Sequence, residues 1–169
     1  MSRSVALLRG INVGTQPRIG MAALRTLVES LGATDVSTYL QSGNVVFSGS
    51  VSAASIETAV AAQFGVSPRV LVLTTAEFRA VGAEIPIREI ADDPSRGFVY
   101  FMEAVPASVS VPEGIEPEVF IVGELGAYQW SPEGASKSKL KPSFFKTLGP
   151  TATARNLRTV DALLAMLDA

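Results

Sequence analysis

The spacing of apolar residues over positions 1–74 restricts the fold of this chain more than any other feature. It predicts two helices and four strands in the order strand, helix, strand, strand, helix, strand. We expect the strands at residues 4–11, 36–40, 45–47 and 69–73, and the helices after Gly20 and after Ser52 or Ser55. Between the second and third strands, the segment QSGN has the composition of a tight turn, which indicates an antiparallel hairpin. This order is that of the split βαβ, or ferredoxin-like, arrangement, in which both helices cover one face of an antiparallel sheet.

The second half of the chain repeats this pattern less completely. Strands are predicted at residues 97–102, 118–122 and 127–130, a short helix at 143–148 and an amphipathic helix after Asn156. Residues 104–117 hold three prolines and show no helical pattern. Thr74 and Glu77 have the spacing of a capping box for a further helix between the two halves.

We therefore expect an α+β protein made of two tandem ferredoxin-like (split βαβ) alpha-beta plaits with antiparallel sheets. The predicted organisation is a first ferredoxin-like unit at 1–74 and a helix with a connecting loop at 75–96. A second, degenerate ferredoxin-like unit with a C-terminal helix follows at 97–169.

Cysteine and histidine are both absent from the chain, and this excludes much chemistry. The chain can form no disulfide, no thiolate zinc site and no Ser-His-Asp or Cys-His catalytic centre. A metal would need oxygen ligands, and the sequence indicates neither a metal site nor a particular cofactor. No apolar run approaches the roughly 20 residues of a membrane span, and no signal peptide is evident. We therefore expect a cytoplasmic protein without a membrane partner.

Positive charge is concentrated in residues 134–160. The net charge of the chain is −2, yet this segment contains no Asp or Glu, and the other 8 of the 14 basic residues share the rest of the chain with all 16 acidic ones. The basic residues of the segment are Lys137, Lys139, Lys141, Lys146, Arg155 and Arg158. Such an island favours an anionic partner, either a small molecule or single-stranded nucleic acid. The alternative is a solvated surface segment without a ligand.

Arg9 interrupts an otherwise apolar strand. Alternation places it on the face that Val5 and Leu7 occupy. Its guanidinium either pairs with an internal carboxylate or offers two hydrogen bonds to a phosphate or carboxylate ligand. Gly10 and Asn12 follow in a loop that could cradle an anion, although turn geometry alone also explains these residues.

The predicted hairpin and the lysine run supply further candidate ligand-binding residues. Gln41, Ser42 and Asn44 suit base edges, ribose hydroxyls or amide groups, unless they serve only to form an exposed turn. In the run ASKSKLK, we include Lys137, Ser138 and Lys139, with an ordinary solvated surface as the alternative.

The start of the C-terminal helix is the third candidate. Arg155 and Asn156 precede the helix and Arg158 lies in its first turn, where positive charge opposes the helix dipole. Two arginines beside free backbone N–H groups suit an anion. The alternative is that Asn156 is a simple cap and that the arginines pair with carboxylates.

Four stretches of the chain, LLRGINVG, MAALRTLVESLGATDVSTYLQSGNVVF, SKSKL and TARNLRTV, resemble a bacterial domain-of-unknown-function family, the one numbered 1697. The resemblance covers nearly the whole chain, and it implies two ferredoxin-like plaits in tandem without an established activity. The family usually has a tryptophan where this chain has Leu157, and the segment at 104–117 is shorter here. If Leu157 only replaces an apolar contact, the Arg-Asn site survives. If the indole stacks on a ligand, this member has lost part of its binding chemistry.

The leading hypothesis is a protein that binds an anionic ligand at a basic site between its two halves. The ligand would be a nucleotide, a phosphorylated small molecule or single-stranded nucleic acid, and the site requires that Arg9 and residues 137–158 meet. A second hypothesis is a histidine-free enzyme acting on a phosphorylated or acyl substrate, with Ser42 or Ser138 as nucleophile. A third is a structural dimerisation module. The sequence favours no particular catalytic residue or oligomeric state.

Overall fold

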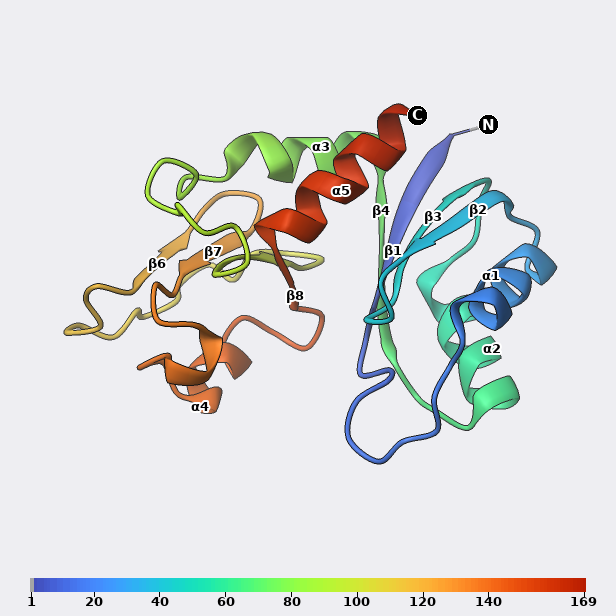
Figure 1. The fold of residues 1–169 in the computed structure, drawn as a ribbon, viewed down its shortest axis with the longest axis horizontal. Coiled ribbons are helices and arrows are strands. Elements are labelled where there is room, and N and C mark those ends of the chain that lie inside the picture. The colour runs from blue at the N-terminus through green and yellow to red at the C-terminus, as the bar shows by residue number, and fades with distance from the viewer. Residues whose placement is uncertain (1) are drawn as a thin grey trace. The chain divides into compact units, whose positions relative to one another are not determined.

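Two four-stranded antiparallel sheets organise the chain, as the computed structural model of residues 2–169 shows (Figure 1). The strands of the first sheet are β1 (Arg3–Arg9), β2 (Thr34–Tyr39), β3 (Asn44–Ser48) and β4 (Arg69–Thr74), in the spatial order β2-β3-β1-β4. The strands of the second sheet are β5 (Gly97–Phe101), β6 (Val119–Val122), β7 (Ala127–Trp130) and β8 (Thr153–Asn156), in the order β6-β7-β5-β8. In both sheets the first strand along the chain lies between the third and the fourth. This shared order confirms two tandem plaits.

Five α-helices accompany the sheets in the part of the chain that the structure describes. They are α1 (Met21–Ser30), α2 (Ala53–Phe64), α3 (Thr75–Glu84), α4 (Pro142–Lys146) and α5 (Leu157–Asp168), and a 3-10 turn, η1, spans Ala135–Lys137. The Ser52 side chain caps α2 by accepting a hydrogen bond from the N–H of Ser55. The predicted capping box of α3 is confirmed, because Thr74 and Glu77 each accept a hydrogen bond from the backbone N–H of the other.

The chain divides into two units. Unit 1 consists of the residues up to Arg79 together with Ala162–Ala169, and unit 2 consists of Ala80–Asp161. Helices α3 and α5 therefore each contribute residues to both units. The boundaries that we predicted at residues 74 and 97 stay a prediction.

In unit 1, helices α1 and α2 lie on the same side of the sheet (Figure 1). Their core includes Leu24 and Ile56 from the helices and Ala6 and Leu8 from β1. The alternate residues of β1 point to the other face of the sheet, and Leu7 on that face is buried as well. Burial on both faces explains why β1 reads as a continuous apolar run rather than as an alternating strand.

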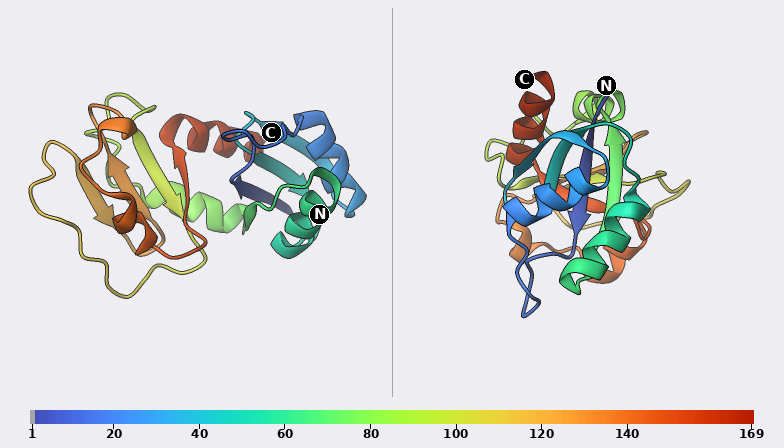
Figure 2. Two further views of the ribbon diagram at one scale, coloured as in Figure 1. Left: turned by 90° about the horizontal axis from the view of Figure 1, so that it is seen from below. Right: turned by 90° about the vertical axis from the view of Figure 1, so that its right-hand side faces the viewer.

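Unit 2 replaces the first helix of the plait with an irregular segment. The chain from Met102 to β6 forms no helix (Figure 2) and supplies Met102 and Ile115 to the core on one face of the sheet. Aromatic side chains fill this core, with Phe120 and Phe144 in edge contact at a centroid distance of 4.9 Å. Stacked and tilted rings supply the contact area that a packed helix would otherwise provide. The second plait is degenerate in this respect, because an irregular segment stands in place of its first helix.

Strand β8 was not predicted from the sequence. It is only four residues long, and its inward positions are Thr153 and Arg155, which carry no apolar alternation. Antiparallel pairing with β5, rather than an apolar alternation in its own residues, makes this segment a strand. Tyr128 and Trp130, which alternate around Gln129, are buried as core residues.

No helix among residues 2–169 has the length and apolarity that crossing a membrane requires.

Gly43, which has φ +98°, lies close against side chains of β1 and of the loop that follows it. A Cβ atom there would lie 2.8 Å from Leu8 Cβ and 2.9 Å from Ile11 Cδ1. We expect Gly43→Ala to lower the free energy of unfolding by about 2–4 kcal/mol, because it adds overpacking to the strain of a left-handed conformation. The measurement is urea unfolding followed by far-ultraviolet circular dichroism.

The matched control is Gly14→Ala. Gly14 also has a positive φ, +59°, but nothing lies within 4 Å of the added Cβ. In this variant only the strain of the left-handed backbone should lower the free energy of unfolding, by about 1 kcal/mol. Equal losses in the two variants would show that packing at Gly43 contributes nothing.

Candidate functional site

The loop after β1 and the β2–β3 hairpin are held together by the side chain of Asn12. Its Nδ2 donates hydrogen bonds to the carbonyl oxygens of Ile19 (3.1 Å) and Gln41 (2.8 Å), and its Oδ1 accepts one from the N–H of Ile19 (2.7 Å). Arg18 also donates to the carbonyl oxygen of Asn12. The motifs RGINVG and LQSGN therefore form one connected surface. Within that surface, the side chain of Asn12 joins the loop to the hairpin.

The strand register places Arg9 between two other polar residues. On one side, Arg9 is paired directly with Arg69 of β4. On the other side, Leu7 is paired with Asn44, and the N–H of Leu8 donates to the carbonyl oxygen of Gly43 at 2.8 Å. Continuing this register sets Ser42 opposite Arg9. We call Ser42, Arg9 and Arg69 the arginine row. All three residues are exposed.

The polar residues of the hairpin divide into supporting and exposed ones. Asn44 is fully buried, and its Nδ2 donates to the carbonyl oxygen of Tyr39 (2.7 Å) and to Ser42 Oγ (3.2 Å). Ser42, which belongs to the arginine row, and Gln41, which precedes it in the sequence, are both exposed. Asn44 therefore shapes the turn, while Gln41 and Ser42 present their side chains to solvent.

Two large apolar side chains are exposed on the same connected surface. Leu40 is 55% exposed and Val13 is 53% exposed, and each adjoins one end of the Asn12–Gln41 hydrogen bond. Leu40 also has φ +59°, a left-handed conformation that costs a leucine about 1–2 kcal/mol. Glycine or asparagine would adopt this conformation at lower cost.

In unit 2, the lysine run is anchored by the buried carboxylate of Glu118, which is 6% exposed. Glu118 accepts hydrogen bonds from Ser138 Oγ (2.5 Å), Gln129 Nε2 (2.6 Å), Ser131 Oγ (2.9 Å) and the N–H of Lys139 (2.9 Å). Burial alone would raise the pKa of Glu118, but these hydrogen bonds together lower it below its ordinary value. The carboxylate therefore stays charged and fixes residues 138–139 to β6 and β7.

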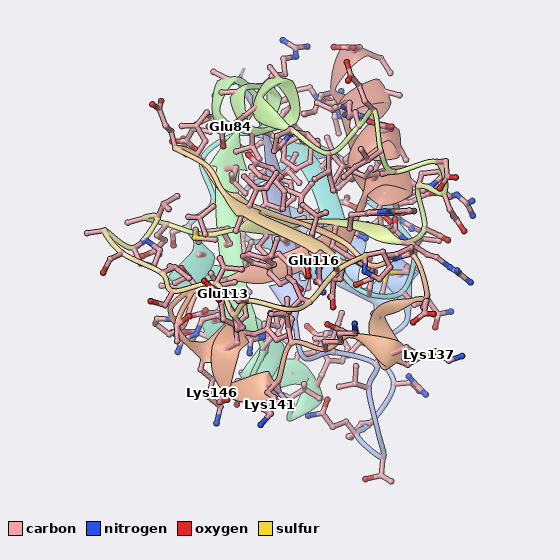
Figure 3. All side chains as sticks on the ribbon, turned by 90° about the vertical axis from the view of Figure 1, so that its left-hand side faces the viewer. Glu84, Glu113, Glu116, Lys137, Lys141 and Lys146 are labelled. Carbon is pink, nitrogen blue, oxygen red and sulfur yellow. The ribbon has the colours of Figure 1, made fainter. Side chains whose placement is uncertain are left out.

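This network bears on the predicted roles of the lysine run. The hydroxyl proton of Ser138 points to a carboxylate whose lowered pKa makes it a weak base, and Lys139 Nζ donates to the carbonyl oxygen of Glu116 at 2.8 Å. Lys137 and Lys139 line a shallow hollow together with Glu133. Lys137 lies well apart from Lys141 and Lys146, which flank α4 (Figure 3). The lysines of unit 2 are thus spread over its surface.

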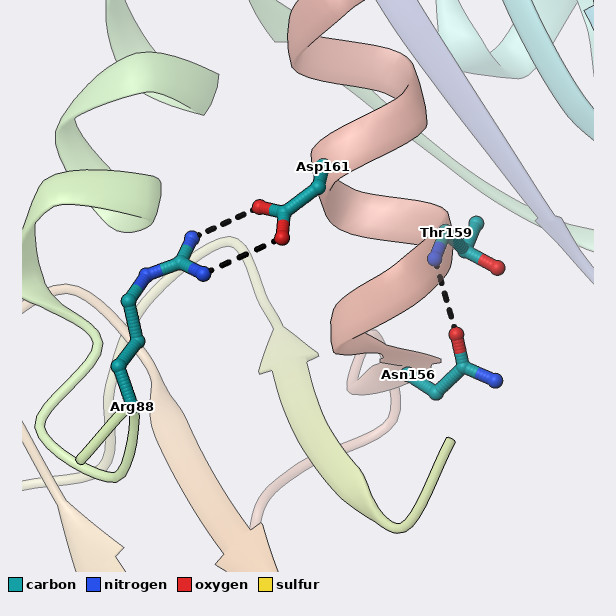
Figure 4. Close-up of polar contacts among 4 residues, drawn as sticks. All are labelled: Arg88, Asn156, Thr159 and Asp161. Carbon is teal, nitrogen blue, oxygen red and sulfur yellow. Dashed lines mark hydrogen bonds and ion pairs between the residues drawn. The ribbon is translucent and has the colours of Figure 1, made fainter. Parts of the chain in front are cut away.

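At the start of α5, the cap reading of Asn156 is confirmed. Its Oδ1 accepts a hydrogen bond from the N–H of Thr159 at 2.9 Å (Figure 4). Arg155 is 9% exposed and donates from Nη1 to the carbonyl oxygen of Ala154 at 2.8 Å, and burial lowers its pKa to about 10. Arg158 is exposed. A neighbouring ion pair joins both terminal nitrogens of Arg88 to the carboxylate of Asp161.

The structure thus brings Arg9, Gly10, Asn12, Gln41, Ser42 and Asn44 together in unit 1, and it places Lys137, Ser138, Lys139, Arg155, Asn156 and Arg158 in unit 2. The prediction that Arg9 and residues 137–158 form one site joins residues of different units and stays a prediction. Arg69, Leu40 and Glu118 were not singled out from the sequence. Arg69 could have been found by extending the predicted register of β1 and β4, whereas no local signal marks Leu40 or Glu118.

Comparison with known proteins relates the chain to conserved bacterial proteins. Residues 1–119 match the family described as "Protein of unknown function (DUF1697)", which confirms the resemblance seen in the sequence. Among solved structures, the chain is similar to the conserved bacterial protein SP0830 from Streptococcus pneumoniae, with 28% sequence identity and a TM-score of 0.71 over 98% of each chain. No curated protein matches the chain.

The Glu118 network predicts a pH-dependent contribution to stability. Since the pKa is lowered on folding, the stabilisation is fully present above the ordinary value of 4.5 and is lost as pH falls through the lowered pKa. We expect Glu118→Gln to cost about 2–3 kcal/mol at pH 7, because an amide nitrogen would then face hydrogen-bond donors. The difference from the wild type should shrink below pH 4.5. Denaturant unfolding monitored by the fluorescence of Trp130 measures it.

Glu113→Gln provides the control, since Glu113 is an exposed carboxylate of the same unit. This change should leave the stability within about 0.5 kcal/mol of the wild type at every pH. A constant loss in Glu118→Gln from pH 7 to pH 3 would contradict the assignment of the effect to the charged carboxylate.

Proposed function

The chain belongs to the DUF1697 family of proteins of unknown function, and we propose that this member binds an anionic ligand at the arginine row of unit 1. The ligand is a nucleotide, a phosphorylated small molecule or single-stranded nucleic acid. The observation that carries the proposal is the direct cross-strand pairing of Arg9 with Arg69.

Like charges on directly opposed residues of an antiparallel pair destabilise the sheet. In β1 and β4 the two arginines are exposed and share one face of the sheet with Leu7 and Leu71. A bound anion between the guanidinium groups would form an attractive interaction with each of them. Its negative charge would be shared by two planar groups whose fork geometry matches phosphate oxygens.

The surroundings of the row support an anion as well. Ser42 adds an exposed hydroxyl on the other side of Arg9, and Gln41 adds an exposed carboxamide. On β4, Glu57 of α2 accepts a hydrogen bond from the N–H of Val70 at 2.8 Å. Arg69 and Glu57 line one surface hollow, so this carboxylate is a neighbour of Arg69 that is already held by a backbone N–H.

The basic residues of unit 2 support the same function less directly. Lys137, Lys139 and Arg158 are exposed and could extend a phosphate-binding surface, but Ser138 and Asn156 use their side-chain oxygens within unit 2. No observation in unit 2 favours the enzyme hypothesis, because the hydroxyl of Ser138 donates to a charged carboxylate with a lowered pKa. We therefore propose a binding function.

Titration calorimetry with sodium pyrophosphate at low ionic strength tests the proposal. We expect binding that weakens as salt is added, and a loss of about 10–100-fold in affinity in Arg9→Ala and in Arg69→Ala, since each removes charge-assisted hydrogen bonds. Arg9→Lys should lie between these variants and the wild type, because it keeps the charge but loses the planar fork.

The matched control is Arg79→Ala, which removes one exposed positive charge that pairs with Asp168 in the same unit. Its affinity for pyrophosphate should stay within about twofold of the wild type, because a distant exposed charge acts weakly. The proposal is wrong if pyrophosphate does not bind, or if Arg79→Ala weakens binding as much as Arg9→Ala does.

A further inference from the structure

We infer that the ligand of the arginine row is a nucleotide, whose base packs against Leu40 and Val13 while its phosphate lies on Arg9 and Arg69. This inference rests on the proposed function and adds the chemical class of the ligand. It starts from Leu40, the residue whose presence in the hairpin folding alone does not explain.

Leu40 combines two unfavourable features. Its φ of +59° lies in the left-handed region, which leucine rarely adopts, and 55% of its surface is exposed. A strained side chain that is buried can be retained for its packing, but the packing of Leu40 is largely incomplete. Strained residues of this kind cluster at ligand-binding sites, where the strain holds a side chain ready for contact.

Val13 is a second exposed apolar residue on the connected surface. The hydrogen bond from Asn12 Nδ2 to the carbonyl oxygen of Gln41 measures 2.8 Å and ties together the two backbone segments that carry these side chains. Val13 is 53% exposed. The Asn12 hydrogen bond thus holds close together the two backbone segments that carry these exposed apolar side chains.

The order of side chains along this surface matches the order of groups in a nucleotide. Apolar Leu40 is followed by the carboxamide of Gln41 and the hydroxyl of Ser42, and the register then leads to the guanidinium groups of Arg9 and Arg69. A base has apolar faces and edges that carry hydrogen-bond donors and acceptors, and a ribose carries hydroxyls. The guanidinium groups of Arg9 and Arg69 come last in this order, and such groups bind phosphate.

A free nucleotide and a nucleotide unit of a single strand share this chemistry, and the experiment distinguishes them. Titration calorimetry of the full chain compares ribose 5-phosphate with AMP and CMP, which carry the same sugar phosphate with a base. We expect AMP to bind at least about fivefold more tightly than ribose 5-phosphate in the wild type. A single-stranded tetranucleotide that binds more than tenfold better than AMP assigns the site to nucleic acid, and equal affinity assigns it to free nucleotide.

Leu40→Asn separates the base contact from the phosphate contact. Asparagine tolerates the left-handed conformation, so this variant should have a higher melting temperature than the wild type. It should bind ribose 5-phosphate as the wild type does and lose the advantage of AMP. Leu125→Asn, which changes an exposed leucine of unit 2, should preserve that advantage.

The two proposals fail in different ways. If pyrophosphate and ribose 5-phosphate bind but the base adds no affinity, the nucleotide inference is overturned and the anion site stands. If none of these compounds binds, both proposals fall. A lower melting temperature in Leu40→Asn also overturns the inference, because Leu40 would then be retained for folding.

Discussion

The surface of unit 1 depends on the contact between Gly43 and the end of β1. With no Cβ, Gly43 approaches Leu8 and Ile11 closely enough that its carbonyl oxygen receives the N–H of Leu8. This hydrogen bond extends the sheet register beyond Asn44, the first residue of β3, and so decides which hairpin residue lies opposite Arg9. Asn12 then fixes the loop after β1 to the same hairpin. Two motifs separated by some thirty residues in sequence thus become one connected surface through one close packing contact and the carboxamide of Asn12.

Unit 2 reaches the same strand order with different means. Where unit 1 covers its sheet with α1 and α2, unit 2 uses an irregular segment, a five-residue helix and a group of aromatic rings. Irregular segments leave backbone polar groups without helical partners, and carboxylate side chains accept hydrogen bonds from some of these groups. Glu118 accepts the N–H of Lys139, and Glu84 accepts the N–H groups of Glu124 and Leu125 at the turn between β6 and β7. In unit 2, carboxylates therefore accept hydrogen bonds from backbone N–H groups that regular secondary structure would otherwise pair.

The sequence was sufficient to predict the fold class, because hydrophobic spacing marks each long element. Met21–Ser30 and Ala53–Phe64 have apolar faces and end near glycines, and the turn at Gly43 leads into the buried strand β3. Strand β8 escaped prediction because Thr153 and Arg155 are its inward residues, and polar inward residues give no periodic signal. The residues of the candidate surface were predicted in part. Arg9, Gln41 and Ser42 stand out beside apolar strands, whereas the importance of Arg69 arises only from its register with Arg9. The left-handed backbone conformation of Leu40 could not be predicted from its residue type, since leucine is not a typical turn residue.

The division of the chain into units has a consequence for how the protein is made. Unit 2 is one continuous stretch, Ala80–Asp161, but unit 1 needs Ala162–Ala169 in addition to its N-terminal portion. During synthesis from the N-terminus, every residue of unit 2 leaves the ribosome before the last residues of unit 1 do. All the strands of the first plait are therefore translated early, but the segment Ala162–Ala169, which completes unit 1, is translated only after the whole of unit 2.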